Sequence, residues 1–299
     1  MELLYTFPHA VSHADGKNTA STLLFGWSVD PQLGGPMRVA RFALSVSISF
    51  LLSFSLAAHQ TNTSKPQAQQ LLQQSLNALS GGQTLSDVTL SGTARRIAGS
   101  DDETGTATYK AISGANRLDL SLSGGARSET ANSTATPPAG SWSGPNGASH
   151  PMAFHNLTNQ AGISPAFTLA ALTPAQNFVM VLVGQETKNG HSVYHLSASQ
   201  QFPQMAAKTA TLEQHLTQMD IFLDASTLLP VALDFSTHPD NDAGVDIPVE
   251  LLFSDYRAVA GAQVPFHIQK FFNNSLLLDL LFTNAQLNSG LSATLFNVQ

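Results

Sequence analysis

The chain has 299 residues, of which only 11% are charged, and its formal net charge is −7. An average soluble domain is roughly 25% charged, so this chain is poor in charge. The acidic balance argues against a nucleic-acid partner, because phosphate contacts depend on Lys and Arg. The sequence contains no cysteine, which excludes disulfides, cysteine-ligated zinc and a lipidated cysteine behind a signal sequence. The stability of the fold must therefore come from a packed core.

Residues 37–58 have the layout of a secretory signal peptide. Arg38 and Arg41 precede an uncharged apolar run, which ends in small residues at Ala57 and Ala58. This order of basic, apolar and small residues predicts export and cleavage after one of the two alanines. We therefore expect a periplasmic or secreted protein. The alternative is an uncleaved inner-membrane anchor, because about 20 uncharged residues can span a bilayer.

Two further segments flank this signal. Residues 1–36 have no hydrophobic periodicity and contain Gly34-Gly35-Pro36, so we interpret them as a non-native leader upstream of a true start at Met37. Residues 59–299 are long enough for a single domain with a sizeable core.

The first half of this domain predicts a helix, three strands and a loop. A helix is expected over 65–82, where four leucines recur at helical spacing: Leu71, Leu72, Leu76 and Leu79. Alternating runs at 86–98, 103–112 and 116–124 predict strands joined by tight turns. Residues 124–152 are rich in Gly, Ser, Thr and Pro, and they predict a long loop with at most a short strand near 127–132.

The second half predicts short helices followed by a run of strands. Helices are expected at 152–159, 164–176 and 203–218, and the turn Asn189-Gly190 predicts a hairpin over 177–199. Five further strands are expected at 219–226, 229–238, 247–259, 265–272 and 275–287. A curved antiparallel sheet around a few helices gathers all these elements into one α+β domain.

Several of these strands are apolar on both faces. Phe178 and Met180 point one way while Val179 and Val181 point the other, and residues 220–223, 249–253 and 276–282 repeat the pattern. A sheet in a soluble protein usually buries only one face. Either other layers cover both faces, or the sheet encloses an apolar cavity for a ligand.

No motif predicts a chemical reaction, a metal or a cofactor. His191 and His195 share one strand face without further ligands at a diagnostic spacing. The stretch GSWSG carries Trp142 where a nucleophile elbow needs serine. The acidic run at 101–103 is expected in a solvated hairpin turn. An enzyme, for example a hydrolase that uses His155 or His195, is the least supported of the functions considered.

Patterns along the chain resemble a known family. A leading amphipathic helix precedes the early strands, a strand-turn-strand unit contains Leu229-Pro230, and the closing segment 256–296 carries Tyr256, Val264-Pro265 and a terminal Leu295-Phe296. In these features residues 66–296 resemble the periplasmic lipoprotein carrier and sorting superfamily of the LolA/LolB type. The resemblance implies an unclosed β-barrel wrapped around helices, with an apolar cavity for acyl chains.

The resemblance also implies a function and candidate residues. We expect an exported, non-catalytic carrier that binds a lipid, an acyl chain or a lipidated polypeptide. The family's cavity arginine, which holds the lid helices, corresponds to Arg96 or alternatively Arg95. From the strands with two apolar faces we predict these cavity walls: Phe178, Met180, Phe222, Leu252, Phe272 and Leu281. The alternative is a structural or interaction module of the cell envelope with a filled core, which docks membrane-associated partners through the loop around Trp142.

Overall fold

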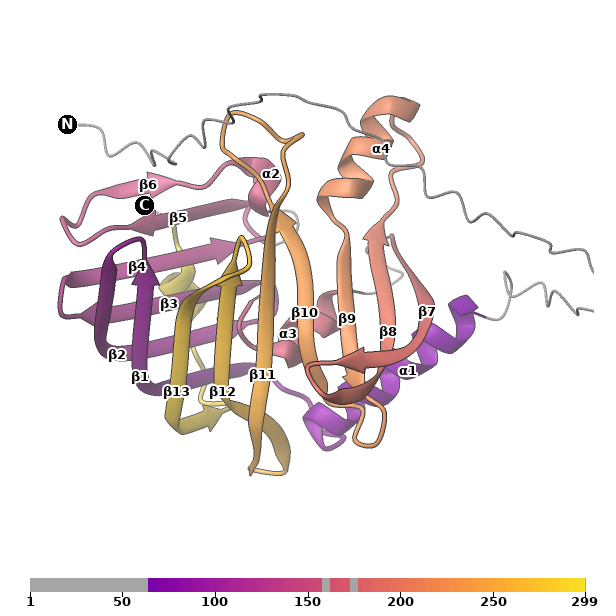
Figure 1. The fold of residues 1–299 in the computed structure, drawn as a ribbon, viewed down its shortest axis with the longest axis horizontal. Helices are drawn as coiled ribbons and strands as arrows, with labels where there is room; N and C mark the ends of the chain where they lie inside the picture. The colour runs from indigo at the N-terminus through magenta and orange to yellow at the C-terminus, as the bar shows by residue number, and fades with distance from the viewer. Residues whose placement is uncertain (1–63, 158–161, 173–176, 299) are drawn as a thin grey trace, which may run out of the picture. The chain divides into compact units, whose positions relative to one another are not determined.

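The computed structural model describes residues 64–157, 162–172 and 177–298, and within them thirteen strands form one antiparallel sheet (Figure 1). The strands are β1 (Asp87–Ala98), β2 (Asp101–Ile112), β3 (Ala115–Leu122), β4 (Gly125–Asn132), β5 (Ala139–Ser143), β6 (Ser149–Pro151), β7 (Phe178–Lys188), β8 (His191–Gln200), β9 (Met219–Asp224), β10 (Pro230–Thr237), β11 (Ile247–Val259), β12 (Ala262–Phe272) and β13 (Ser275–Leu287). The helices are α1 (Ser64–Ser80), α2 (Phe154–Leu157), α3 (Pro165–Ala171), α4 (Ala207–Leu216) and the 3-10 turn η2 (Ala293–Phe296). The predicted leader and signal peptide lie outside the described residues.

The order of the strands is β6-β5-β4-β3-β2-β1-β13-β12-β11-β10-β9-β8-β7. Two meanders are therefore joined where the first strand pairs with the last, and the outermost strands, β6 and β7, are not paired with each other. The chain passes from one edge to the other through α2 and α3. This unclosed antiparallel sheet with helices confirms the predicted fold class.

The core lies on one face of this sheet, which we term the concave face. Along β1 the residues Val88, Leu90 and Ala94 are buried on it, and the adjacent strands contribute more leucine, isoleucine and phenylalanine. Helix α1 adds Ala68 and its leucine stripe, and α3 adds Leu169. One apolar face of the sheet and two helices thus form the main hydrophobic core.

Most of the long loop predicted at 124–152 is not present, and the short strand expected near 127–132 corresponds to β4. Strands β4, β5 and β6 occupy this segment, and Trp142 lies within β5 opposite Glu129 of β4. These strands lie towards one edge of the sheet, and their small and polar residues give little apolar alternation. Backbone pairing orders them instead, β4 with β3, β5 with β4 and β6 with β5. The predicted docking loop around Trp142 is therefore wrong.

Two hairpin turns consist of residues that favour positive φ angles. Asn189-Gly190 joins β7 to β8 with φ angles of 52° and 83°, and Asn273-Asn274 joins β12 to β13 with φ angles of 48° and 62°. Both pairs have the positive φ angles of a type I′ turn, which Asn and Gly tolerate best. These turns fix the registers of β7 against β8 and of β12 against β13.

Asp87 joins the start of β1 to the segment that follows β13. Its Oδ1 accepts hydrogen bonds of 2.8 Å from the backbone N–H and the hydroxyl of Ser289, and its Oδ2 accepts one of 2.9 Å from the Gly290 N–H. Burial acts to raise the pKa of Asp87, but these hydrogen bonds outweigh it and lower the pKa to about 2. Folding therefore favours the ionised form.

We expect Asp87→Asn to lower the free energy of unfolding at pH 7 by about 2 kcal/mol, since each unit of pKa shift corresponds to ~1.4 kcal/mol. Because the pKa is lowered by folding, this stability is present above about pH 4 and is lost as the pH falls towards 2. Urea unfolding between pH 7 and pH 2 measures the difference, with the exposed Asp240→Asn as the control. Equal stability of Asp87→Asn and wild type at pH 7 would contradict this role.

Gly81 ends α1 and packs against the turn between β11 and β12. Its φ is +62°, and a Cβ at this position would collide with the carbonyl oxygen of Gly261. Gln83 Nε2 also donates a 2.6 Å hydrogen bond to the Ala260 carbonyl at the same turn. The C-terminal end of α1 is therefore held tightly at this turn.

We expect Gly81→Ala to destabilise the protein by more than the ~1–2 kcal/mol that a left-handed φ costs an L-residue, because the added Cβ also displaces the turn. Gly82→Ala is the matched control, since Gly82 has φ +80° but open space around its Cβ position. Thermal unfolding of both variants separates the two effects. Equal destabilisation by the two substitutions would mean that the contact with Gly261 is unimportant.

Candidate functional site

Helices α1 and α3 pack against part of the concave face. Helix α1 contacts β7, β12 and α3, and it buries Leu71, Leu72 and Leu79. A crevice of about 10 Å³ lies where α3 meets β1, β12 and β13, and it is lined by residues that include Val88, Phe167, Val264 and Leu287. Such a space holds about one water molecule. An acyl chain can enter this crevice only if a helix moves.

A buried tyrosine positions the start of α3. Tyr109 of β2 is 1% exposed, and its hydroxyl accepts a 3.3 Å hydrogen bond from the Ser164 N–H. Burial raises the pKa of Tyr109 well above its ordinary value, so the hydroxyl stays neutral. Apart from this polar contact, α3 rests on the sheet through apolar residues such as Leu169.

A charged cluster occupies the other end of the same face. Arg127 of β4 donates to both carboxylate oxygens of Glu103 on β2, with distances of 2.8–3.2 Å. Arg96 of β1 donates to the same carboxylate at 3.3 Å. Glu103 is only 8% exposed, and a Cβ at Gly124 would collide with its carboxylate. The acidic run at 101–103 is therefore not a solvated turn, because Glu103 points inward from β2.

An ion pair across the interior extends this cluster. Lys270 Nζ of β12 lies 3.8 Å from Glu129 Oε2 of β4, although β13, β1, β2 and β3 separate the two strands in the sheet. Neighbouring strands lie about 4.8 Å apart, so a flat sheet would separate β4 from β12 by about 24 Å. The sheet therefore curls strongly here, and the concave face becomes the inside of a half-barrel.

The opposite, convex face carries a second cluster around Lys188 of β7. Lys188 Nζ lies 2.7 Å from both Asp234 Oδ2 and Glu250 Oε1, and 4.6 Å from the centroid of the Phe222 ring. His195 stacks on that ring with a centroid distance of 4.5 Å. Burial acts to lower the pKa of Lys188, but the two carboxylates outweigh it and raise the pKa. Burial raises the pKa of Asp234.

A cleft of about 380 Å³ borders this cluster and contains four carboxylates: Asp220, Asp234, Asp246 and Glu250. Each of them has a basic partner in the structure. Lys188 contacts Asp234 and Glu250, and histidines contact the other two. All four carboxylates are therefore in contact with other side chains of the protein, and we interpret them as part of a structural network.

We expect Lys188→Met to lower the free energy of unfolding by about 2 kcal/mol, because it leaves two half-buried carboxylates without a cation. The effect is smaller than for a fully buried pair, since the Lys188 side chain is 22% exposed. Urea unfolding at pH 7 gives the difference. Lys208→Met, on the exposed surface of α4, is the control. Indistinguishable stabilities of the two variants would disprove the role of Lys188.

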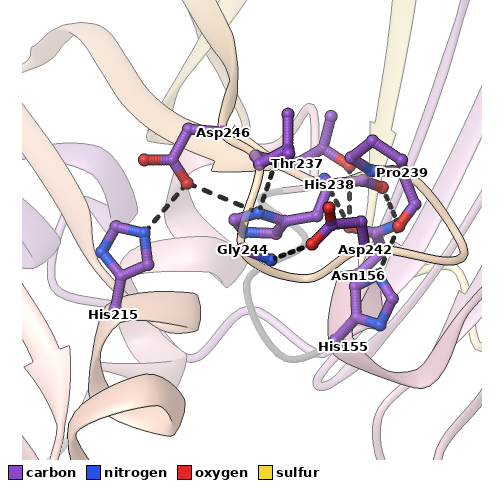
Figure 2. A network of polar contacts seen from close by, with 10 residues as sticks. His155, Asn156, His215, Thr237, His238, Pro239, Asp242, Gly244 and Asp246 are labelled. Atoms are coloured by element: carbon purple, nitrogen blue, oxygen red, sulfur yellow. Dashed lines mark hydrogen bonds and ion pairs between the residues drawn. The ribbon is translucent and has the colours of Figure 1, made fainter.

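Figure 2 shows a polar network that ties the loop between β10 and β11 to α2 and α4. Asn156 of α2 donates to the His238 carbonyl at 2.7 Å and accepts from Thr237 Oγ1 and the His238 N–H. Asp246 Oδ1 lies 2.9 Å from His215 Nε2 of α4 and 3.4 Å from His238 Nδ1. These contacts fix α2 and α4 at the rim, whereas α1 and α3 rest on the concave face mainly through apolar side chains.

Three histidines meet in this network, yet their nitrogens do not converge on one point. Within residues 64–157, 162–172 and 177–298, no group of three or more His, Asp or Glu side chains is arranged to hold a metal ion. No helix in these ranges is long and apolar enough to cross a membrane.

The structure separates the seven predicted site residues onto the two faces. Met180 lies in the concave core, Phe178 packs against it, and Phe272 is opposite Val249 on the same face. Arg96 is also concave, at the charged end. Whether these four residues contact a ligand stays a prediction.

The other three predicted residues lie on the convex face. Phe222 and Leu252 pack with Ala232 and Val193 in a separate small cluster, and Leu281 is 49% exposed opposite Thr93. The strand registers correct the expectation that these three residues share one cavity with Met180. Successive residues of a strand point to opposite faces of the sheet, and these three point to the convex face. Sequence reasoning also missed Glu103, Arg127 and Lys270, whose partners are distant in the chain.

These features define the class of protein by its fold: an unclosed antiparallel half-barrel whose apolar concave face is covered by helices. A domain assigned to outer membrane lipoprotein sorting from Vibrio parahaemolyticus is similar, with a TM-score of 0.51, 12% identity and coverage of 79% of this chain and 96% of that one. A DUF1329 family protein from Desulfovibrio piger gives a TM-score of 0.50 and 11% identity, with coverages of 77% and 97%.

A LolA superfamily protein from Nitrosomonas europaea aligns with a TM-score of 0.46 and 12% identity, covering 77% of this chain and 97% of that one. The sequence matches no protein-family profile and no curated protein. The two structures with TM-scores of 0.51 and 0.50 show that the chain has their fold, which agrees with the fold that the sequence resemblance implies. At these identities the likeness concerns the fold alone.

Proposed function

We propose that the chain is an exported, non-catalytic carrier that binds a lipid, an acyl chain or a lipidated polypeptide between the concave face and helices α1 and α3. The observation that carries this proposal is the distribution of contacts. The polar network at the rim fixes α2 and α4, while the two helices over the concave face rest on apolar side chains that an acyl chain can replace. Export rests on the predicted signal peptide at 37–58.

The covering helices are suited to displacement. Helix α3 has only seven residues and no side-chain cap, so it has little stability of its own. Helix α1 buries the hydroxyl of Ser75 without a hydrogen-bond partner, at a cost of about 1–3 kcal/mol. Its C-terminal end is held at Gly81, which makes that end the pivot.

The size of the displaced surface indicates the kind of ligand. Three buried leucines of α1 contribute roughly 5–9 kcal/mol, at ~1.5–3 kcal/mol each. An acyl chain with about ten buried methylenes supplies ~8 kcal/mol, which lies within the range of this loss. A single chain therefore approximately balances the cost, whereas two chains exceed it. We infer a preference for ligands with two acyl chains.

A second candidate function is an interaction module of the cell envelope that binds membrane-associated proteins without a lipid. The small crevice beside α3 favours it, because it is too small for an acyl chain in this structure. In that case α1 and α3 are permanent parts of the core, and the protein takes up no lipid.

Lipid uptake from vesicles distinguishes the two functions. We expect the purified chain to remove a diacyl phospholipid from pelleted vesicles at a near 1:1 ratio, measured by mass spectrometry of the supernatant. Phe178→Ser, on the concave side of β7, should lower the uptake several-fold, since it removes an apolar contact. Val183→Ser, on the same strand but 59% exposed, is the control.

Thermal unfolding of each variant checks that both are folded at the temperature of the assay. No uptake by the wild type would sink the carrier proposal and favour the interaction module. Uptake that both substitutions leave unchanged would place the ligand elsewhere on the molecule.

A further inference from the structure

The charged end of the concave face has more positive than negative groups. Three cations, Arg96, Arg127 and Lys270, are in contact with two carboxylates, Glu103 and Glu129. One positive charge is therefore in excess, although the whole chain has a net charge of −7. Charge complementarity favours an anion at this place.

The same pair of strands provides an internal comparison. Arg95 of β1 pairs with Asp102 of β2 on the convex face, where the two side chains are 50% and 51% exposed. One residue further along, Arg96 pairs with Glu103 on the concave face at 17% and 11% exposure. Taking charges out of water costs free energy that a pair seldom recovers, so stability alone gives little reason for the inward-facing pair.

The donors of this cluster are not all used. Arg96 makes one described hydrogen bond, a 3.3 Å contact from Nη1 to Glu103, out of five N–H groups. Arg127 binds the same carboxylate through Nε and Nη2, which fixes its plane. Glu103 thus acts as a positioning residue that holds two guanidinium groups at one point. Guanidinium groups bind phosphate and carboxylate oxygens in a fixed, bidentate geometry.

The distance to the apolar end matches the length of a lipid. Val88 borders the crevice beside α3, and Arg96 lies eight residues further along β1, which corresponds to about 26 Å at ~3.3 Å per residue. An acyl chain in one bilayer leaflet extends over roughly 15 Å, half of the ~30 Å hydrocarbon core. Strand β1 is therefore long enough to accommodate an acyl chain and, at the Arg96 end, a lipid head group.

We infer that the ligand is an anionic amphiphile whose phosphate head group binds Arg96 and Arg127, with its acyl chains directed along β1 towards Val88. This inference rests on the proposed carrier function and adds the charge and the orientation of the ligand. Lys270 contributes to the field but is paired with Glu129. A zwitterionic head group gains less at this end, because its own cation faces the excess positive charge, and a neutral head group gains less because it has no negative charge.

The test compares two lipids with identical acyl chains. Vesicles of phosphatidylglycerol and of phosphatidylcholine are incubated with the purified chain, the vesicles are pelleted, and the lipid bound to protein is quantified by mass spectrometry. We expect the wild type to retain phosphatidylglycerol about tenfold over phosphatidylcholine, the low end of what a charge-assisted hydrogen bond provides.

Four substitutions locate the effect. Arg96→Gln and Arg127→Gln should each reduce the preference several-fold, whereas Arg95→Gln on the convex face should keep it. Arg96→Lys retains the charge without the bidentate geometry, so it should keep more of the preference than Arg96→Gln does, which separates the part played by charge from that played by geometry. Thermal unfolding of all variants accompanies the assay.

The outcomes are distinct. Equal retention of the two lipids by the wild type, or an unchanged preference in both Arg96→Gln and Arg127→Gln, would overturn the head-group site while leaving the carrier function intact. Uptake of neither lipid would overturn the carrier function and the inference together. Inorganic phosphate is the remaining probe: if it binds Arg96 as tightly as phosphatidylglycerol does, the site serves a free anion, and the lipid head group is refuted.

Discussion

The ladder between β1 and β13 brings together the first and last strands of the sheet, and the concave face depends on it. These strands pair from Val88–Leu287 to Arg96–Leu278, with one bulge between. The pairing joins two meanders into a single curled sheet whose edges, β6 and β7, remain apart. Without it, the apolar sides of the two meanders would not form one continuous surface, and α1 and α3 would have no common surface to cover.

The covered surface combines two kinds of contact. Polar networks hold the parts that we regard as fixed, such as the β10–β11 loop with Asn156 and His238. Apolar contacts hold α1 and α3, and they are the contacts that acyl chains reproduce without directional bonds. Apolar walls of this kind select a ligand by size more than by chemistry. Charge recognition is confined to the end with Arg96, Glu103 and Arg127.

The elements of the fold could be predicted because each has a strong local pattern. The leucine stripe of α1 and the turns Asn189-Gly190 and Asn273-Asn274 depend on residues close in sequence. The short strand predicted near 127–132 corresponds to β4, but β5 and β6 were missed because Gly, Ser, Thr and Pro give little apolar alternation. Pairing of β5 with β4 and of β6 with β5 orders these two strands.

The site was harder to predict than the elements. A strand such as 249–253 is apolar on both faces, so sequence alone cannot say which side meets α1 and α3. The registers resolve this, since Leu251 lies in the main core and Leu252 packs with Phe222 on the convex side. The charged end escaped notice because Glu103 and Arg127 lie 24 residues apart, and Lys270 reaches Glu129 only through the curl of the sheet.

Hydrogen–deuterium exchange with and without a bound diacyl phospholipid tests the central claim, that α1 and α3 leave the concave face to admit a ligand. We expect at least tenfold faster exchange of amides in 64–80 and 165–171 when lipid is bound, because both helices then lose the tertiary contacts that stabilise them. Amides of β1 and β13 should keep their protection. Lipid binding with unchanged protection of both helices would contradict the account.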